Sequence, residues 1–88
     1  MPYILPKDRT ELLANNEYRY PESAGELNFL FTKLIDLYLG VNKNYQAIND
    51  CLGALEGAKL ELYRRVAAPY EDKKIKANGD VYSEETLK

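Results

Sequence analysis

The residues best suited to chemistry in this 88-residue chain gather toward its C-terminal end. They combine cations with tyrosines, and they are Lys59, Tyr63, Arg64, Arg65, Tyr70, Lys73 and Lys74. Arginine offers phosphate oxygens a planar fork of donors, and a tyrosine ring offers a nucleobase a face for stacking. One interpretation of the pattern is therefore a site for an anionic ligand or partner. The alternative is a solvated helix end, in which Glu61, Glu71 and Asp72 pair with the cations.

Catalytic and metal-binding arrangements are poorly represented in the sequence. The chain has no histidine, so neither a Ser–His nor a Cys–His pair can form, and the commonest metal ligand is missing. Glu56 and Glu61 are each followed three residues later by a cation, where a di-iron helical bundle places histidine. The single cysteine, Cys51, lies beside an apolar stripe and is expected to be a buried structural thiol. We therefore expect a protein that is not an enzyme and needs no metal or cofactor.

Charge and hydropathy limit the kinds of partner. The formal net charge is −2, whereas duplex binding needs a broad basic footprint, so general DNA binding is not expected. No apolar run approaches the ~18 residues of a membrane span, and the N-terminal segment lacks a signal-peptide core. A lone cysteine cannot form an intramolecular disulfide, which fits an intracellular protein. These features predict a cytoplasmic location without a membrane partner.

The spacing of apolar residues predicts the helices that must position the cluster. One helical domain is expected over residues 1–88, with an arm and short helix at 1–22, helices at 23–39, 44–68 and 69–78, and a tail at 79–88. Pro6 suits the first turn of the short helix, which continues over residues 7–14. Ser23 and Glu26 match a capping box that starts the next helix, and Gly40 suits a left-handed residue that stops it.

Pro69 interrupts the long helical pattern. Proline has no N–H for the carbonyl four residues back, and it disfavours helical geometry at the residue before it. The chain either kinks there and continues, or it starts a new helix with Pro69 in the first turn. Glu71 and Asp72 favour a new start, and the Asn78–Gly79 pair closes that helix. The tail after it is expected to be extended or disordered unless its apolar residues dock.

Two amphipathic helices joined by a short connector are expected to pack as an antiparallel hairpin. The predicted fold class is all-α, with this hairpin, a short N-terminal helix and a C-terminal helix bent at Pro69. A hairpin has two apolar sides and buries one against itself, so we expect a dimer or a larger symmetric oligomer. Gly53 and Gly57 lie four residues apart in the long helix, where they either mark close packing or face solvent.

A turn at Pro69 would also affect the cationic cluster. It would bring Arg64 or Arg65 toward Lys73 or Lys74, and an oligomer would repeat the group at a boundary between subunits. A bend in the chain at this proline would therefore favour the anionic-ligand hypothesis.

Three stretches, "MPYI", "GELNFLFTKLI" and "AINDCLGALEGAKLELYRRVAAPYEDKKIKANGDVY", carry a resemblance over most of the chain. They resemble a family of short uncharacterised proteins encoded by tailed phages and by bacteria that carry phage genes. The block from Ala54 to Tyr82 is the most specific part. The resemblance implies a phage origin and a location in the host-cell cytoplasm. The layout is also loosely similar to phage anti-CBASS proteins, sponges that form symmetric oligomers and sequester cyclic-nucleotide signals of host immunity.

Three functional hypotheses follow. The first is a non-catalytic phage protein that oligomerises and binds an anionic ligand, and so sequesters a nucleotide immune signal. The second is a helical interaction protein that caps or inhibits a phage protein or a host defence protein, through an exposed stripe of Phe31, Ile35, Tyr38 and Leu39. The third is a minor structural component of the virion.

Overall fold

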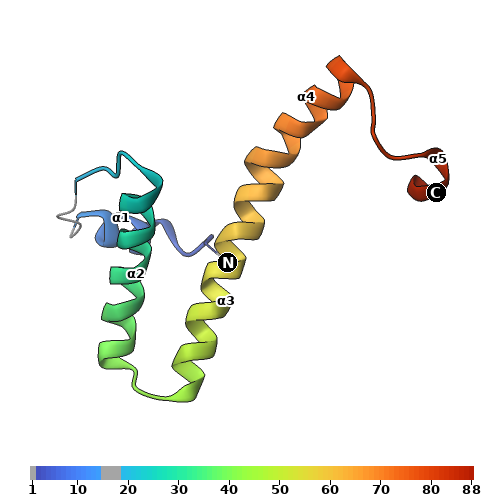
Figure 1. The fold of residues 1–88 in the computed structure, drawn as a ribbon. Helices are drawn as coiled ribbons and strands as arrows, with labels where there is room; N and C mark the ends of the chain where they lie inside the picture. The colour runs from blue at the N-terminus through green and yellow to red at the C-terminus, as the bar shows by residue number, and fades with distance from the viewer. Residues whose placement is uncertain (1, 15–18) are drawn as a thin grey trace.

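The computed structural model describes residues 2–14 and 19–88, and Figure 1 shows the order of its helices along the chain. The elements are α1 (Pro6–Ala14), α2 (Ala24–Val41), α3 (Tyr45–Leu62), a π-helical turn η1 (Tyr63–Ala67), α4 (Ala68–Asn78) and α5 (Glu84–Leu87). The described residues contain no strand, so the predicted all-α class is confirmed. The part of the predicted loop at 15–18 lies outside the described residues.

Capping side chains explain where the first two helices begin. Pro6 is the first residue of α1, as its lack of an N–H predicts. The Ser23 hydroxyl accepts a hydrogen bond from the Glu26 N–H at 3.1 Å and so caps α2. The Glu26 carboxylate accepts from the Glu22 N–H at 3.0 Å, one residue earlier than a standard capping box requires.

The predicted stop of α2 at Gly40 is wrong. Gly40 does not adopt the positive φ that a left-handed helix end needs, so the helix continues through it to Val41. The helix ends at Asn42, whose backbone N–H and side-chain amide both donate to the Tyr38 carbonyl at 3.0 Å. These two bonds satisfy a carbonyl of the last turn without a glycine. The helix therefore does not need to end at Gly40, as the sequence had predicted.

At Pro69 the helical path continues and a new helical element begins beside it. Figure 1 shows α3, η1 and α4 as one continuous rod. In an ordinary α-helix the ring of Pro69 would meet the Arg65 carbonyl four residues back. The chain instead widens into a π-helical turn, in which the Ala68 N–H donates to the Tyr63 carbonyl five residues back. The proline is thus accommodated within the rod, in the first turn of α4, which begins at Ala68.

The C-terminal segment contains more structure than an extended tail. Gly79 ends α4 with a φ of 91°, and its N–H donates to the Ile75 carbonyl at 2.8 Å. The short helix α5 then forms within the predicted tail, where the Ser83 hydroxyl accepts from the Thr86 N–H at 3.3 Å.

The arm before α1 contacts α3 (Figure 1). The Tyr3 hydroxyl donates a 2.7 Å hydrogen bond to the Glu61 carboxylate, which also accepts from Arg64 at 3.1 Å. Together these bonds lower the pKa of Glu61, with the tyrosine bond as the larger cause. The guanidinium of Arg9, in α1, lies 5.9 Å from the centre of the Tyr3 ring and makes a cation–π contact with the arm.

The chain keeps very little interior of its own. Among the described residues the one buried residue is Ala47, which is 1% exposed. The accessible surface is 8165 Å², whereas a compact protein of this mass exposes about 5,300 Å². The radius of gyration is 17.8 Å, against roughly 12 Å for a compact domain of this length. Most of the large apolar side chains therefore remain open to solvent.

Candidate functional site

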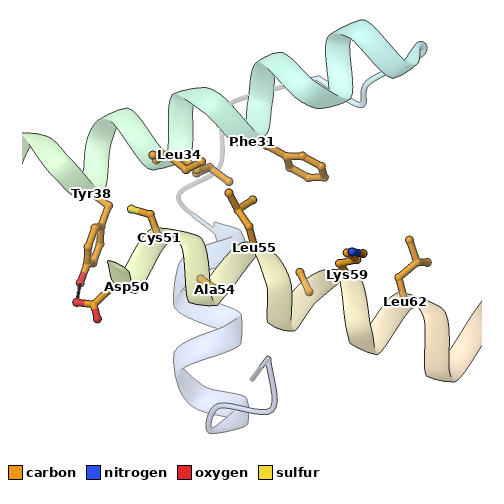
Figure 2. Close-up of a pocket in the computed structure, with 11 residues that line it drawn as sticks. Phe31, Leu34, Tyr38, Asp50, Cys51, Ala54, Leu55, Lys59 and Leu62 are labelled. Atoms are coloured by element: carbon orange, nitrogen blue, oxygen red, sulfur yellow. Dashed lines mark hydrogen bonds between the residues drawn. The ribbon is translucent and has the colours of Figure 1, made fainter. Parts of the chain in front are cut away.

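A groove of about 650 Å³ lies between α2 and α3. Figure 2 shows side chains from both helices directed into it. From α2 the groove receives Phe31, Leu34, Ile35 and Tyr38, which recur at steps of three and four residues and so share one helix face. Three of these four belong to the stripe expected from the sequence, and Leu39 of that stripe does not line the groove.

The α3 side of the groove alternates large and small apolar residues. It is formed by Cys51, Ala54, Leu55, Ala58 and Leu62, again on one helix face. Leu55 is 39% exposed and Leu62 is 61% exposed, although both are side chains that a core would bury. Cys51 is partly buried in the wall of the groove, so its thiol is less buried in the single chain than predicted.

One end of the groove is acidic and hydrogen-bonded. The Tyr38 hydroxyl donates to the Asp50 carboxylate at 3.1 Å, which links α2 to α3 (Figure 2). The other oxygen of Asp50 accepts from the Gln46 side-chain amide at 2.9 Å. The bond to Asp50 is the main cause that raises the pKa of the Tyr38 hydroxyl, so this tyrosine stays neutral.

The other end of the groove carries a cation. Lys59 lines the groove one turn before Leu62, and its ammonium lies 3.7 Å from the Glu56 carboxylate. Both side chains are more than half exposed, so this ion pair contributes little to stability. The groove is thus apolar along its middle, with Asp50 at one end and Lys59 at the other.

The shape and chemistry of the groove suit an amphipathic helix. The α3 wall runs from Cys51 to Leu62, a length of about 17 Å or three helical turns. An amphipathic helix laid in such a groove buries apolar residues at i, i+3, i+4 and i+7 and leaves its polar face in water. The polar ends of the groove can pair with charges that flank the apolar face of the bound helix.

The seven predicted ligand-binding residues lie along the rod and do not surround a common pocket. Lys59 belongs to α3, Tyr63, Arg64 and Arg65 belong to η1, and Tyr70, Lys73 and Lys74 belong to α4. The axial distance from Lys59 to Lys74 is about 22 Å. Because the rod does not turn at Pro69, it does not bring the arginines toward the lysines as expected.

Some members of this cluster have partners and others do not. Arg64 donates to both oxygens of Glu61 at 3.1 and 3.3 Å, as the salt-bridge alternative predicted. The Lys74 ammonium lies 5.6 Å from the centre of the Tyr70 ring, a cation–π contact. The Glu71 carboxylate raises the pKa of the Tyr63 hydroxyl by its negative charge.

Two cations of the cluster, Arg65 and Lys73, form no ion pair with any of the described residues. Their charged atoms lie beyond salt-bridge distance of the carboxylates in that part of the chain. The rod therefore offers Arg65, Lys73 and the Tyr70–Lys74 pair to an anion, spread over several turns.

The sequence indicated the α2 wall but not its partner wall. The signal that could have found it is the run Cys51, Ala54, Leu55 and Ala58, in which small and large apolar residues share a face. A side chain at the neighbouring Gly53 would meet no atom within 4 Å, so of the two alternatives for this glycine the described chain shows an open position and not close packing.

The described residues offer few signs of other chemistry. They contain no group of three or more Cys, Asp and Glu side chains placed to hold a metal ion. None of the described helices is both long enough and apolar enough to cross a membrane.

The comparisons with known proteins place the chain in one family. A family model described as "Domain of unknown function (DUF6899)" matches residues 1–81, so the chain belongs to this family. No curated protein and no solved structure matches the chain.

Proposed function

We propose that this protein is a non-catalytic helical interaction protein of tailed-phage origin, and that it acts by holding an amphipathic helix in the groove between α2 and α3. The proposal includes the antiparallel pairing of α2 and α3 as the two walls of the site. The fold supplies the walls, the bound helix supplies the missing core, and no chemical step is needed.

The observation that carries the proposal is an apolar groove in a chain that buries one described residue. Leu34 is 58% exposed and Phe31 is 46% exposed, although both point into the space between two helices (Figure 2). Water in that space is released when an apolar helix enters. The favourable free energy of this burial is about 25 cal/mol for each Å² of apolar surface removed from solvent. A large exposed apolar patch is the usual mark of a protein interaction site.

A photo-crosslinker placed in the groove tests this function. We would replace Phe31 with p-benzoylphenylalanine and irradiate infected cells that produce the protein. The matched control carries the same replacement at Phe29, which lies about 160° around α2 from Phe31 and is not part of the groove. We expect a covalent protein adduct from position 31 and little from position 29. The absence of an adduct from position 31, or equal adducts from both positions, would contradict the proposal.

Binding of an anionic small molecule is the second candidate function. It is favoured by Arg65 and Lys73, which have no ion-pair partner among the described residues, beside the stacked Tyr70 and Lys74. Bound phosphates would take the place of the missing carboxylates. A cyclic nucleotide held in this way would be sequestered and not transformed.

Calorimetry against a panel of cyclic di- and trinucleotides tests this second candidate. We expect heat of binding with at least one member, and we expect Lys73→Glu to abolish it. Lys33→Glu on α2 is the matched control, because Lys33 already pairs with Asp36 far from the cluster. A panel that gives no heat with any member would remove this candidate.

A further inference from the structure

We propose that the groove is filled by α3 of a second copy of this chain, packed antiparallel to α3 of the first. The inference rests on the proposed function, because it names the occupant of the same groove. The two copies would form a bundle of four helices around a two-fold axis, with α2 and α3 of each copy as its walls.

The exposed surface of the single chain is the first argument. The chain exposes 8165 Å², about 2,900 Å² more than a compact protein of its mass. Permanent dimer interfaces bury about 2,000–5,000 Å² counted over both partners. The excess can supply such an interface even though the arm and residues 79–88 account for part of it. When two copies associate, each chain covers exposed surface of the other and removes it from solvent.

The charges at the ends of the groove are the second argument. Asp50 and Lys59 both line the groove, and they lie at equal distances from the midpoint between Ala54 and Leu55. Asp50 and Lys59 lie half a turn apart around α3, so a two-fold axis through that midpoint brings Asp50 of one copy to the same level as the partner's Lys59, on the opposite flank of the helix pair. Parallel packing would instead bring like charges to the same level, so the charges favour the antiparallel arrangement.

The sizes of the apolar side chains are the third argument. In the antiparallel register Leu55 faces the partner's Ala54, and Cys51 faces the partner's Ala58. Each large or medium side chain thus meets a small one, as close packing of two helices requires. The alternation along α3, which has no counterpart in the α2 wall, is explained by this pairing.

A single charged residue at the axis tests the interface. We would measure the mass by sedimentation equilibrium for the wild-type chain, for Leu55→Glu and for Leu60→Glu. Leu60 lies about 140° around the helix from Leu55 and is 58% exposed outside the groove, so it is the matched control. Glutamate and leucine have similar helix propensity, and circular dichroism checks that both variants remain helical.

The wild-type chain and Leu60→Glu are expected to sediment at twice the chain mass of 10.1 kDa or a higher multiple. Leu55→Glu is expected to weaken association by at least roughly thirtyfold, as for a central interface residue. A helical wild-type monomer would overturn the inference. So would dissociation by Leu60→Glu while Leu55→Glu remains associated.

Exchanged charges test the register, and they remain informative if Leu55→Glu fails to fold. Asp50→Lys and Lys59→Asp each bring like charges to the same level at both ends of a dimer of identical copies, and each is expected to weaken it about threefold at low salt. Mixing the two variants in equal amounts restores both opposite-charge pairs, so the mixture is expected to recover the dimer. Loss of the Tyr38 bond to Asp50 within a chain would not be repaired by mixing. A mixture that stays monomeric would overturn the antiparallel register.

The crosslinking and sedimentation results separate the inference from the proposed function. An adduct from position 31 to another copy supports both. An adduct to a different protein, with a monomeric wild-type chain, supports the interaction function and overturns the second copy as occupant. No adduct, with a monomeric chain, overturns both.

Discussion

Dilution of the protein is expected to lower its melting temperature. A chain that buries Ala47 alone among its described residues lacks the core needed for a cooperative fold. If two copies share one core, unfolding also separates them, and the apparent stability depends on protein concentration. The perturbation is therefore concentration itself, and no residue needs to be changed.

The size of the effect follows from the length of the chain. Unfolding entropy is about 2.1 cal/mol/K per residue, so two chains of 88 residues contribute roughly 370 cal/mol/K. Each tenfold dilution of a dimer removes about 1.4 kcal/mol of apparent stability. Dividing this loss of stability by the unfolding entropy gives a fall of about 4 °C in the melting temperature for each tenfold dilution.

Thermal unfolding followed by circular dichroism at 222 nm is the assay. Samples spanning about a hundredfold range of concentration are expected to differ by about 8 °C in melting temperature. The dependence should vanish in Leu55→Glu, which separates the copies, and persist in Leu60→Glu. A cooperative transition whose midpoint is the same at all concentrations would refute the reasoning, because a folded monomer behaves in that way.

Three further predictions concern single contacts. Ser23→Ala removes the acceptor of the Glu26 N–H and is expected to cost about 1 kcal/mol, measured by urea denaturation; an unchanged midpoint would show that the cap contributes nothing. Pro69→Ala supplies an N–H and removes the need for the π-helical turn, so a gain of about 1–3 kcal/mol is expected in the same assay, and a loss would contradict the explanation given for that turn. The pKa of Glu61 is lowered in the folded chain, so its contribution is complete above about pH 4.5 and is lost as the pH falls through the lowered pKa. Protection of the arm amides around Tyr3, expressed relative to the intrinsic exchange rate at the same pH, should therefore fall in acid, and Glu61→Gln should remove this change; protection that is the same at all pH values would show that the bond does not hold the arm.

The helix starts could be predicted from the sequence because their causes are local. Pro6, Ser23 and Asn44 each act within four residues, and each begins a helix at or next to the predicted position. The chain at Gly40 and Pro69 was harder to predict for a different reason. Gly40 permits a left-handed ending but does not impose it, and Pro69 is tolerated because a wider turn moves the facing carbonyl away.

The candidate site was harder to predict because it depends on contacts between distant residues. The periodic residues of α2, such as Phe31 and Tyr38, indicated an exposed stripe from the sequence alone. That Tyr38 would donate to Asp50 depends on the angle between two helices, which no local pattern specifies. The cationic cluster was correctly located along the chain, but whether it gathers in space depended on the path of the backbone at Pro69.

Contacts between copies can be observed directly by isotope-filtered nuclear Overhauser spectroscopy on an equal mixture of ¹³C-labelled and unlabelled chains. We predict contacts across the two copies from the methyl groups of Leu55 to those of the partner's Ala54, with Leu60 giving none. A well-dispersed spectrum of a folded protein without any contact between labelled and unlabelled chains would contradict the account.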